Sequence, residues 1–232
     1  MPTCITPTFA PDRSVALPPQ LTDHLRASLG SWPPPDGCVR VTTSAERHRS
    51  SWDGTIVTAM RLDAPSGSVL SVPTPLLKHA PRTASAHDAD RWMRAALPLE
   101  HWQTLDYRWC GVDDPVADFD DAGVWVPHGG SVPEWLRPFN GGVLVATVHG
   151  EHAAAVGIKR HDRHAHEIAV VTSAAHQERG LARRLVAQAT RAIHTRDAVA
   201  LYLHAPDNEA SRRVANHVGY GDHGWHLITT GS

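Results

Sequence analysis

The last third of the chain places an apolar run, a glycine turn and an amphipathic pattern in direct succession. The run Glu167 to Thr172 is rich in β-branched residues, which favours a short strand. From Leu181 onward apolar residues recur at helical spacing, and the opposite face carries arginines and a glutamine. Gly180 precedes this pattern and permits a tight turn. The sequence therefore predicts a strand that passes directly into a helix.

Such a helix presents unpaired backbone N–H groups at its N-terminus, directed toward one point. The helix dipole adds partial positive charge there, so we expect a binding site for an anion, for which phosphate is the usual occupant. Arg179, Arg183 and Arg184 lie beside this point and would add charge-assisted hydrogen bonds. The alternative for each arginine is an ordinary solvated position on the helix surface.

The neighbouring segments continue the alternation of strands and helices. Val199 to His204 reads as a further strand, and Asp207 is placed to cap a helix that ends at Gly219. Upstream, residues 142–149 and 152–160 predict an antiparallel hairpin that leads into the strand at 167.

Two motifs in this region resemble the GNAT superfamily of N-acetyltransferases. The hexamer Gln177 to Ala182 is similar to the family's Q/R-x-x-G-x-G/A motif. Asn208, followed by a helix and by Gly219-Tyr220, is similar to its N-x-x-A/S…G-F/Y pattern. The resemblance covers roughly residues 143–228. The alternative is a generic α/β unit in which Gly180 only permits a turn.

The resemblance implies an α+β fold, with a mixed, mostly antiparallel sheet flanked by helices. It also implies that acetyl-coenzyme A is the cofactor, with its pyrophosphate in the glycine loop and its pantetheine arm along a splayed strand. The residues that would bind coenzyme A are then Ala169, Val170, Val171, Gln177, Arg179, Gly180, Leu181, Ala182, Arg183, Asn208 and Ser211.

Glu167 is the first candidate for the general base, because several members of the family place a catalytic glutamate at the start of this strand. A carboxylate there would take the amine proton directly or through water. The alternative is a strand end that only forms a salt bridge. His164 and His166 are further candidates, but adjacent strand residues point to opposite faces, so His166 and Glu167 cannot both face the acceptor in a regular strand. With His161 these histidines lack metal-ligand spacing, and we predict no metal site.

The general acid is less well defined by the sequence. Many members of the family carry a tyrosine seven residues after the asparagine, where this chain has Ala215. Tyr202 and Tyr220 are the tyrosines that remain in this half of the chain, and Asn208 and Ser211 are polar groups expected near the thiol. Water is the remaining donor for the thiolate.

The whole chain sets broader bounds. A net charge of −2 over 232 residues does not indicate nucleic-acid binding, and no apolar stretch is long enough to span a membrane. Cys4, Cys38 and Cys110 are odd in number and far apart, so we expect reduced thiols. The N-terminus lacks a secretory pattern, and we predict a cytoplasmic protein.

We predict two regions, an α+β region of unknown role at 1–120 and a GNAT-like acetyl-coenzyme A-binding domain at 121–232. In the first, helices are expected at 17–29 and at 88–97, with a weaker continuation to Tyr107, and strands at 38–43, 54–62 and 69–72. This region is either a separate small domain or a diverged half-copy of the same fold.

The predicted function is acetyl-coenzyme A-dependent N-acetylation of a small-molecule or peptide amine, by direct transfer in a ternary complex. The alternative is a non-catalytic acyl-coenzyme A-binding module that senses the cofactor or presents a partner surface. Residues 133–140 fit the family's acceptor loop, and the acidic segment 113–121 either attracts a cationic amine or is a solvated loop. The sequence does not decide whether the protein forms a homodimer.

Overall fold

The computed structural model describes residues 17–51, 53–97, 102–127, 130 and 132–231. These residues divide by their internal packing into two compact units, one formed by the described parts of 1–106 and 223–232 and the other by those of 107–222. This division differs from the boundary predicted after residue 120, because the last strand of the chain packs in the first unit.

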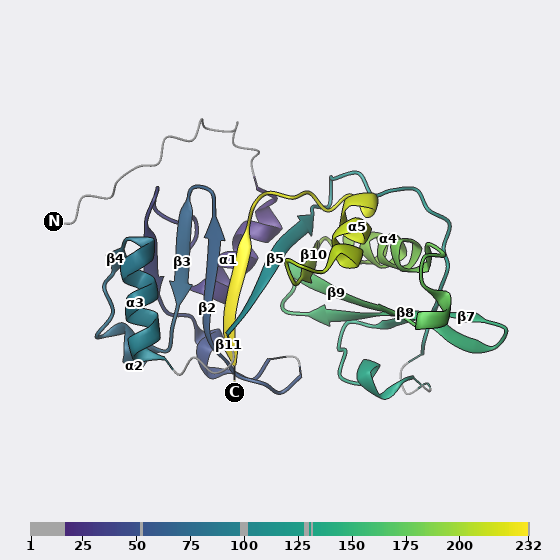
Figure 1. Ribbon diagram of the computed structural model, residues 1–232, viewed down its shortest axis with the longest axis horizontal. Coiled ribbons are helices and arrows are strands. Elements are labelled where there is room, and N and C mark those ends of the chain that lie inside the picture. Colours follow the sequence, from purple (N-terminus) through teal and green to yellow (C-terminus); the bar gives the residue numbers. More distant parts are fainter. Residues whose placement is uncertain (1–16, 52, 98–101, 128–129, 131, 232) are drawn as a thin grey trace. The chain divides into compact units, whose positions relative to one another are not determined.

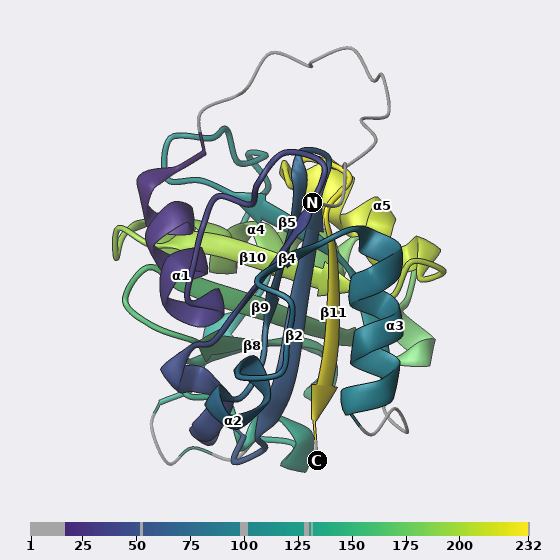
Figure 2. The same cartoon turned by 90° about the vertical axis from the view of Figure 1, so that its left-hand side faces the viewer.

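The first unit contains a sheet with the strand order β4-β1-β3-β2-β11-β5. Helices α1 and α3 lie on opposite faces of these strands (Figure 2), and one core cluster joins strands β1–β3 to α3 through Val39, Leu70, Ala89 and Met93. The elements of this unit are α1 (Pro19–Leu29), β1 (Val39–Thr42), η1 (Ala45–His48), β2 (Val57–Ala64), β3 (Gly67–Ser71), α2 (Thr74–Leu77), β4 (Thr83–Ala84), α3 (Ala86–Ala96), the first half of β5 (Trp102–Cys110) and β11 (His226–Gly231).

The weaker prediction of a helix continuing to Tyr107 is wrong. The helix α3 ends at Ala96, and Leu97 already has extended backbone angles. Residues from Trp102 onward form strand β5, whose aromatic side chains suit a pleated surface better than a helix. Strand β11 was not predicted at all, and it pairs with both β2 and β5.

The second unit contains the strand order β5-β10-β9-β8-β7-β6, with only β9 and β10 parallel among the pairs of β6 to β10. Helices α4 and α5 cover one face of this sheet (Figure 1), around a core that includes Leu144, Val156, Ile168 and Leu185. A smaller cluster around Leu136 and Val145 packs separately. The elements are the second half of β5, β6 (Val124–Trp125), η2 (Glu134–Leu136), β7 (Val143–Val148), β8 (Glu151–Arg160), β9 (Ala165–Thr172), η3 (Ala174–His176), α4 (Leu181–His194), β10 (Val199–His204) and α5 (Glu209–Val218).

This arrangement confirms the predicted fold class, a mixed α+β structure with a mostly antiparallel sheet flanked by helices. The hairpin β7–β8 and the succession β9, α4, β10, α5 lie where the sequence placed them. Their patterns are local, and each element has a clear start or stop signal, such as the left-handed Gly150 (φ 85°) between β7 and β8.

The acidic segment 113–121 is fastened to α4 rather than solvated along its whole length. Arg184 donates to the carbonyls of Asp120 and Asp121, at 3.0 and 3.1 Å. Arg191 donates to the carbonyl of Phe119 and to the carboxylate of Asp121, at 3.0 and 2.7 Å. The helix therefore uses these two arginines to hold the loop.

The expectation of three reduced thiols is wrong for Cys38, which is disulfide-bonded. Cys110 is a buried free thiol. Separation along the chain does not decide which cysteines meet in space, so the count and spacing could not predict this. The cysteines consequently give no support to the predicted cytoplasmic location.

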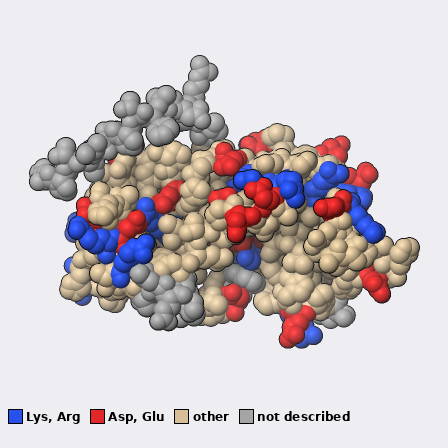
Figure 3. All heavy atoms as spheres, in the orientation of Figure 1, with Lys and Arg blue, Asp and Glu red and all other residues tan. Residues whose placement is uncertain are grey.

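The described residues show how charged side chains and apolar helices are distributed. On the face drawn in Figure 3, acidic and basic side chains are interspersed and do not separate into a field of one sign. No helix in the described part of the chain combines the length and the apolar character needed to cross a bilayer.

The N-cap of α5 is Asn208 and not Asp207, which corrects the sequence-based prediction by one residue. The Asn208 Oδ1 accepts a hydrogen bond from the backbone N–H of Ser211 at 3.0 Å. Aspartate and asparagine cap helices about equally well, so two adjacent candidates cannot be separated by residue type.

We therefore expect Asn208→Ala to lower the free energy of unfolding by about 1 kcal/mol, because it removes the acceptor for an N-terminal N–H. Asp207→Ala is the matched control and should have little effect. Urea denaturation of the two variants without cofactor measures this difference. An equal loss in both, or a larger loss in Asp207→Ala, would contradict the assignment of the cap.

Candidate functional site

Strands β9 and β10 run side by side for only a short distance and then part. Their register contains three residue pairs, from Ala165 opposite Val199 to Glu167 opposite Leu201. Beyond Glu167, β9 continues to Thr172 with β8 as its partner, while β10 continues to His204 without β9. Glu167 thus marks the vertex of a split between two parallel strands.

The backbone of β9 directs hydrogen-bonding groups into this split. Val199 donates to the carbonyl of His164 at 2.8 Å on one side of β9, and Ser173 donates to that of Ala153 at 2.9 Å on the other. Because alternate residues of a strand point their polar groups to opposite sides, those of Val170 and Thr172 point toward the split. Among the described residues, no backbone hydrogen bond joins Val170 or Thr172 to any segment other than β8. An extended ligand can therefore pair with them.

The predicted cofactor residues on β9 differ in direction. Val170 faces the split, whereas Ala169 and Val171 turn their backbone groups toward β8, opposite Gly157 and Ala155. Thr172 also faces the split, and sequence reasoning missed it. The two-residue period of a strand was the signal that would have separated these positions.

The turn after β9 has the geometry of an anion site. Gly180 adopts left-handed angles (φ 74°, ψ 7°) and is the N-cap of α4, with no side-chain cap. Glu178 is also left-handed (φ 61°), which is uncommon for a residue with a side chain. Gln177 and Arg179 are exposed, and Leu181 and Ala182 are half-buried. The first N–H groups of α4 have no acceptor within the helix, so they remain available to a ligand.

Arg183 lies directly beside this turn. A Cβ built on Gly180 would stand 3.0 Å from Nε and 3.1 Å from Nη2 of Arg183. The guanidinium also lies 5.1 Å from the centroid of the Phe119 ring, a distance at which a cation–π contact forms. Arg184 is instead engaged with the 113–121 segment, so of these two neighbours Arg183 is the one placed for an anion.

Glu167 is buried, with 7% of its surface exposed, and it is held by two cationic or polar partners. Lys159 Nζ lies 2.5 Å from its Oε1, and His161 Nε2 lies 3.0 Å from its Oε2. Burial raises the pKa of Glu167, but the hydrogen bond from His161 and the charge of Lys159 outweigh burial and lower the pKa to about 2. The residue is therefore an ionised carboxylate at neutral pH.

The other two histidines considered for the base have different environments. His166 is 2% exposed, and burial lowers its pKa to about 4. Its side chain is on the face of β9 opposite that of Glu167, as strand alternation requires. His164 contacts Arg163. Across the described residues, no group of three or more His, Cys, Asp or Glu side chains is arranged to hold a metal ion.

A family of known proteins shares this sequence pattern. The sequence model of the acetyltransferase (GNAT) family matches residues 97–220, just over half of the chain. The chain belongs to the GNAT acetyltransferase family. No curated protein matches its sequence.

Solved structures resemble this GNAT chain at low sequence identity. One is a GNAT-family protein from Novosphingobium aromaticivorans, with 20% identity, a TM-score of 0.47, and coverage of 57% of this chain and 65% of that one. Another is a GCN5-related N-acetyltransferase-like protein from Streptococcus suis, with 15% identity, a TM-score of 0.48, and coverage of 71% and 79%. This chain therefore spans less than two thirds of the length of the first of them.

Ala215 occupies the position where many GNAT proteins are expected to carry a helix tyrosine. Ala215 is fully buried in the core beneath α5. Tyr220 is also in this core, where its hydroxyl contacts Thr190 Oγ1 at 2.6 Å and burial raises its pKa. Tyr202 lies on β10 beyond the vertex, and burial raises its pKa although a hydrogen bond with Ser211 opposes this. Tyr202 also packs in this core, and Ser211 on α5 bonds with it.

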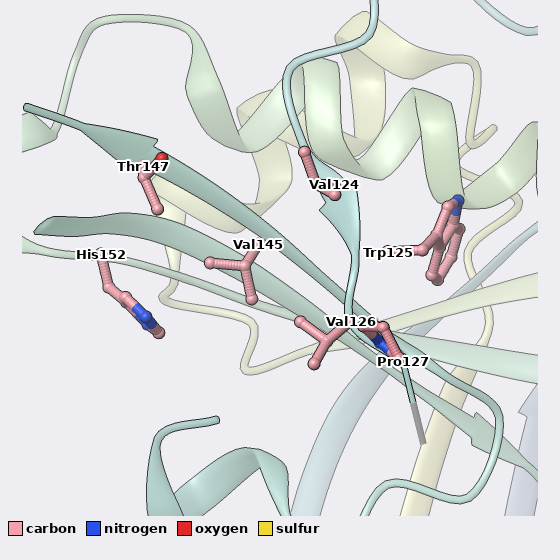
Figure 4. Close-up of a pocket in the computed structure, with 7 residues that line it drawn as sticks. All are labelled: Val124, Trp125, Val126, Pro127, Val145, Thr147 and His152. Carbon is pink, nitrogen blue, oxygen red and sulfur yellow. The ribbon is translucent and has the colours of Figure 1, made fainter. Parts of the chain in front are cut away.

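A pocket of about 240 Å³ opens on strands β6 to β8 of the GNAT domain, lined by Val124, Trp125, Val126, Pro127, Val145, Thr147 and His152 (Figure 4). The register places Val145 opposite Ala155, and Ala155 opposite Val171. Val171 is four residues from Glu167, or about 13 Å at the rise of a strand. The pocket is thus lateral to the vertex and does not include Glu167.

The pKa of Glu167 predicts how stability depends on pH. Since the pKa falls from the ordinary 4.5 to about 2 on folding, the ionised form stabilises the folded state. This contribution is complete above pH 4.5 and is lost as the pH falls toward 2. We expect Glu167→Gln, which has no ionisable carboxylate, to have a lower free energy of unfolding than the wild type at pH 6.

Urea denaturation at several pH values tests this expectation. The difference between wild type and Glu167→Gln should narrow as the pH is lowered from about 4.5. A difference that stays constant from pH 6 to pH 3 would show that Glu167 does not titrate with a lowered pKa.

Proposed function

We propose that this GNAT protein is an acetyl-coenzyme A-dependent N-acetyltransferase that acts on the amine of a small molecule or peptide. Transfer would be direct, in a ternary complex of protein, cofactor and amine. The observation that carries the proposal is the split between β9 and β10, which leads from the vertex at Glu167 to the uncapped N-terminus of α4.

The dimensions of this path fit the cofactor. From Glu167 to Thr172 a strand advances by about 17 Å, which is comparable to an extended pantetheine arm. At one end, the N–H groups of Leu181, Ala182 and Arg183 would bind the diphosphate, with Gly180 allowing close approach. Gln177, Arg179 and the Arg183 guanidinium stand around the same turn. At the other end lies the carboxylate of Glu167.

Asn208 and Ser211, the remaining predicted cofactor residues, would lie near the thiol of coenzyme A. Asn208 fixes the first turn of α5, and Ser211 bonds with Tyr202 next to the free part of β10. The chemistry that bound acetyl-coenzyme A supplies is an acyl group on a good leaving thiol. The protein's part is to hold the thioester and the amine together, which removes much of the entropic barrier.

Direct transfer is favoured over an acyl-enzyme because Cys110 is poorly suited to act as a nucleophile. The thiol is fully buried, and burial raises its pKa to about 12. The predicted cytoplasmic location, the lack of nucleic-acid or membrane partners and the open question of a homodimer belong to this proposal as well.

The alternative function is a non-catalytic module that binds acyl-coenzyme A. The specific observation in its favour is Ala215, which replaces the family's helix tyrosine and is buried. Coenzyme A thiol is acidic enough to leave without a strong acid, so this replacement does not by itself exclude turnover.

We expect Gly180→Ala to weaken binding of coenzyme A at least tenfold, because the added methyl would stand 3.0 Å from Nε of Arg183, displace that guanidinium from the turn, and occupy a left-handed position. Gly150→Ala is the matched control, since Gly150 is also left-handed (φ 85°) and has open space around it. Both variants should lose about 1 kcal/mol of stability. Calorimetry with coenzyme A measures the affinities. Unchanged affinity in Gly180→Ala would contradict the diphosphate assignment.

The catalytic and non-catalytic proposals differ in one assay. We expect free thiol to appear when acetyl-coenzyme A is mixed with the protein and an amine from a panel of amino acids, aminoglycosides, polyamines and peptides. Binding of acetyl-coenzyme A without thiol release from any amine would favour the non-catalytic module.

A further inference from the structure

The carboxylate at the vertex is already engaged at both oxygens. Oε1 of Glu167 binds the ammonium of Lys159, and Oε2 binds the imidazole of His161. The side chain of Glu167 is 9% exposed, whereas that of His161 is 28% exposed. The imidazole is therefore more accessible from solvent than the carboxylate.

The hydrogen bond to Glu167 also selects the tautomer of His161. An ionised carboxylate can only accept hydrogen bonds, so Nε2 of His161 carries the hydrogen. The lone pair then lies on Nδ1. A carboxylate that orients an imidazole in this way also stabilises the imidazolium that forms when the ring takes up a proton.

We infer that His161 accepts the proton of the attacking amine and that Glu167 is a positioning residue that orients the imidazole. This inference rests on the proposed function. It assigns the acid–base role to a residue in the turn between β8 and β9, outside the motifs that identify the family.

Acyl transfer moves one proton from the amine to the imidazole and one electron pair to sulfur. The lone pair of the neutral amine attacks the thioester carbon and forms the C–N bond, while one proton on nitrogen passes to Nδ1 of His161. The C–S bond breaks, and its electron pair leaves on sulfur. The thiolate takes a proton from water, and His161 returns its proton to solvent, to which it is exposed.

The groups around the pair are consistent with this division of roles. Lys159 on β8 neutralises Glu167, and Asp162 follows His161 in the turn. Tyr107 on β5 is buried, and burial together with the charges of Glu167 and Asp162 raises its pKa, so its hydroxyl stays protonated. Of the side chains in contact with Glu167, His161 is the one whose ring has a second nitrogen that can accept a hydrogen bond.

The test uses the full chain and the amine that gives the fastest thiol release. We expect His161→Gln to lower kcat by roughly 10²-fold or more, with unchanged affinity for coenzyme A. Glutamine can keep a hydrogen bond to Glu167 but has no basic nitrogen. His164→Gln is the matched control in the same turn and should retain the wild-type turnover.

Chemical rescue separates a proton acceptor from a structural residue. Added imidazole should restore part of the turnover of His161→Ala, and it should not restore that of Glu167→Gln. Wild-type turnover in His161→Gln together with loss of turnover in Glu167→Gln would overturn the inference, because Glu167 would then take the proton itself. If the wild-type protein releases no thiol with any amine, the proposed function fails, and the inference fails with it.

Discussion

The parting of two parallel strands after Glu167 is the constraint on which the site depends. A paired strand has no free hydrogen-bonding groups, and an unpaired strand inside a sheet is normally unfavourable. Here only a few backbone groups, at Val170 and Thr172, are left without a strand partner, and they face the split. Because β9 remains paired with β8 throughout, the free edge is held in an extended, rigid conformation that can receive a ligand.

The helix α4 links this edge to the anion site and also braces it. Its N-terminus follows β9 after the short helix η3 and a turn that contains two left-handed residues, Glu178 and Gly180. Along its length Arg184, Gln188 and Arg191 bind the backbone of the 113–123 segment, so the helix is anchored to this segment. A fixed helix keeps its first N–H groups at a constant position, which an anion-binding cradle requires.

Much of the second unit could be predicted because its signals are local. The apolar run of β9, the left-handed glycine and the helical spacing of α4 lie in sequence order, and each was sufficient to place its element. The strand β11 could not be placed in this way, because it pairs with β2 and β5, more than a hundred residues earlier. Asn208 and Asp207 could not be distinguished as N-caps, because asparagine and aspartate are about equally common at that position.

The environment of Glu167 shows the same limit more sharply. Its position at the start of β9 was predictable, but its partners were not, because Lys159 reaches it across the strand pair and His161 reaches it from the turn. Those two contacts change a candidate base into an ionised, engaged carboxylate. Residue type alone therefore singled out Glu167 but did not predict the contacts that determine its charge state.

The most direct test of the account is amide hydrogen exchange along β9, measured by NMR with and without saturating coenzyme A. The amides of Val170 and Thr172 should exchange rapidly in the free protein and become protected when the cofactor binds. Those of Ala169 and Val171, which pair with β8, should be slow in both states. Rapid exchange of Val170 and Thr172 that persists at saturation would contradict the claim that the cofactor lies in the split.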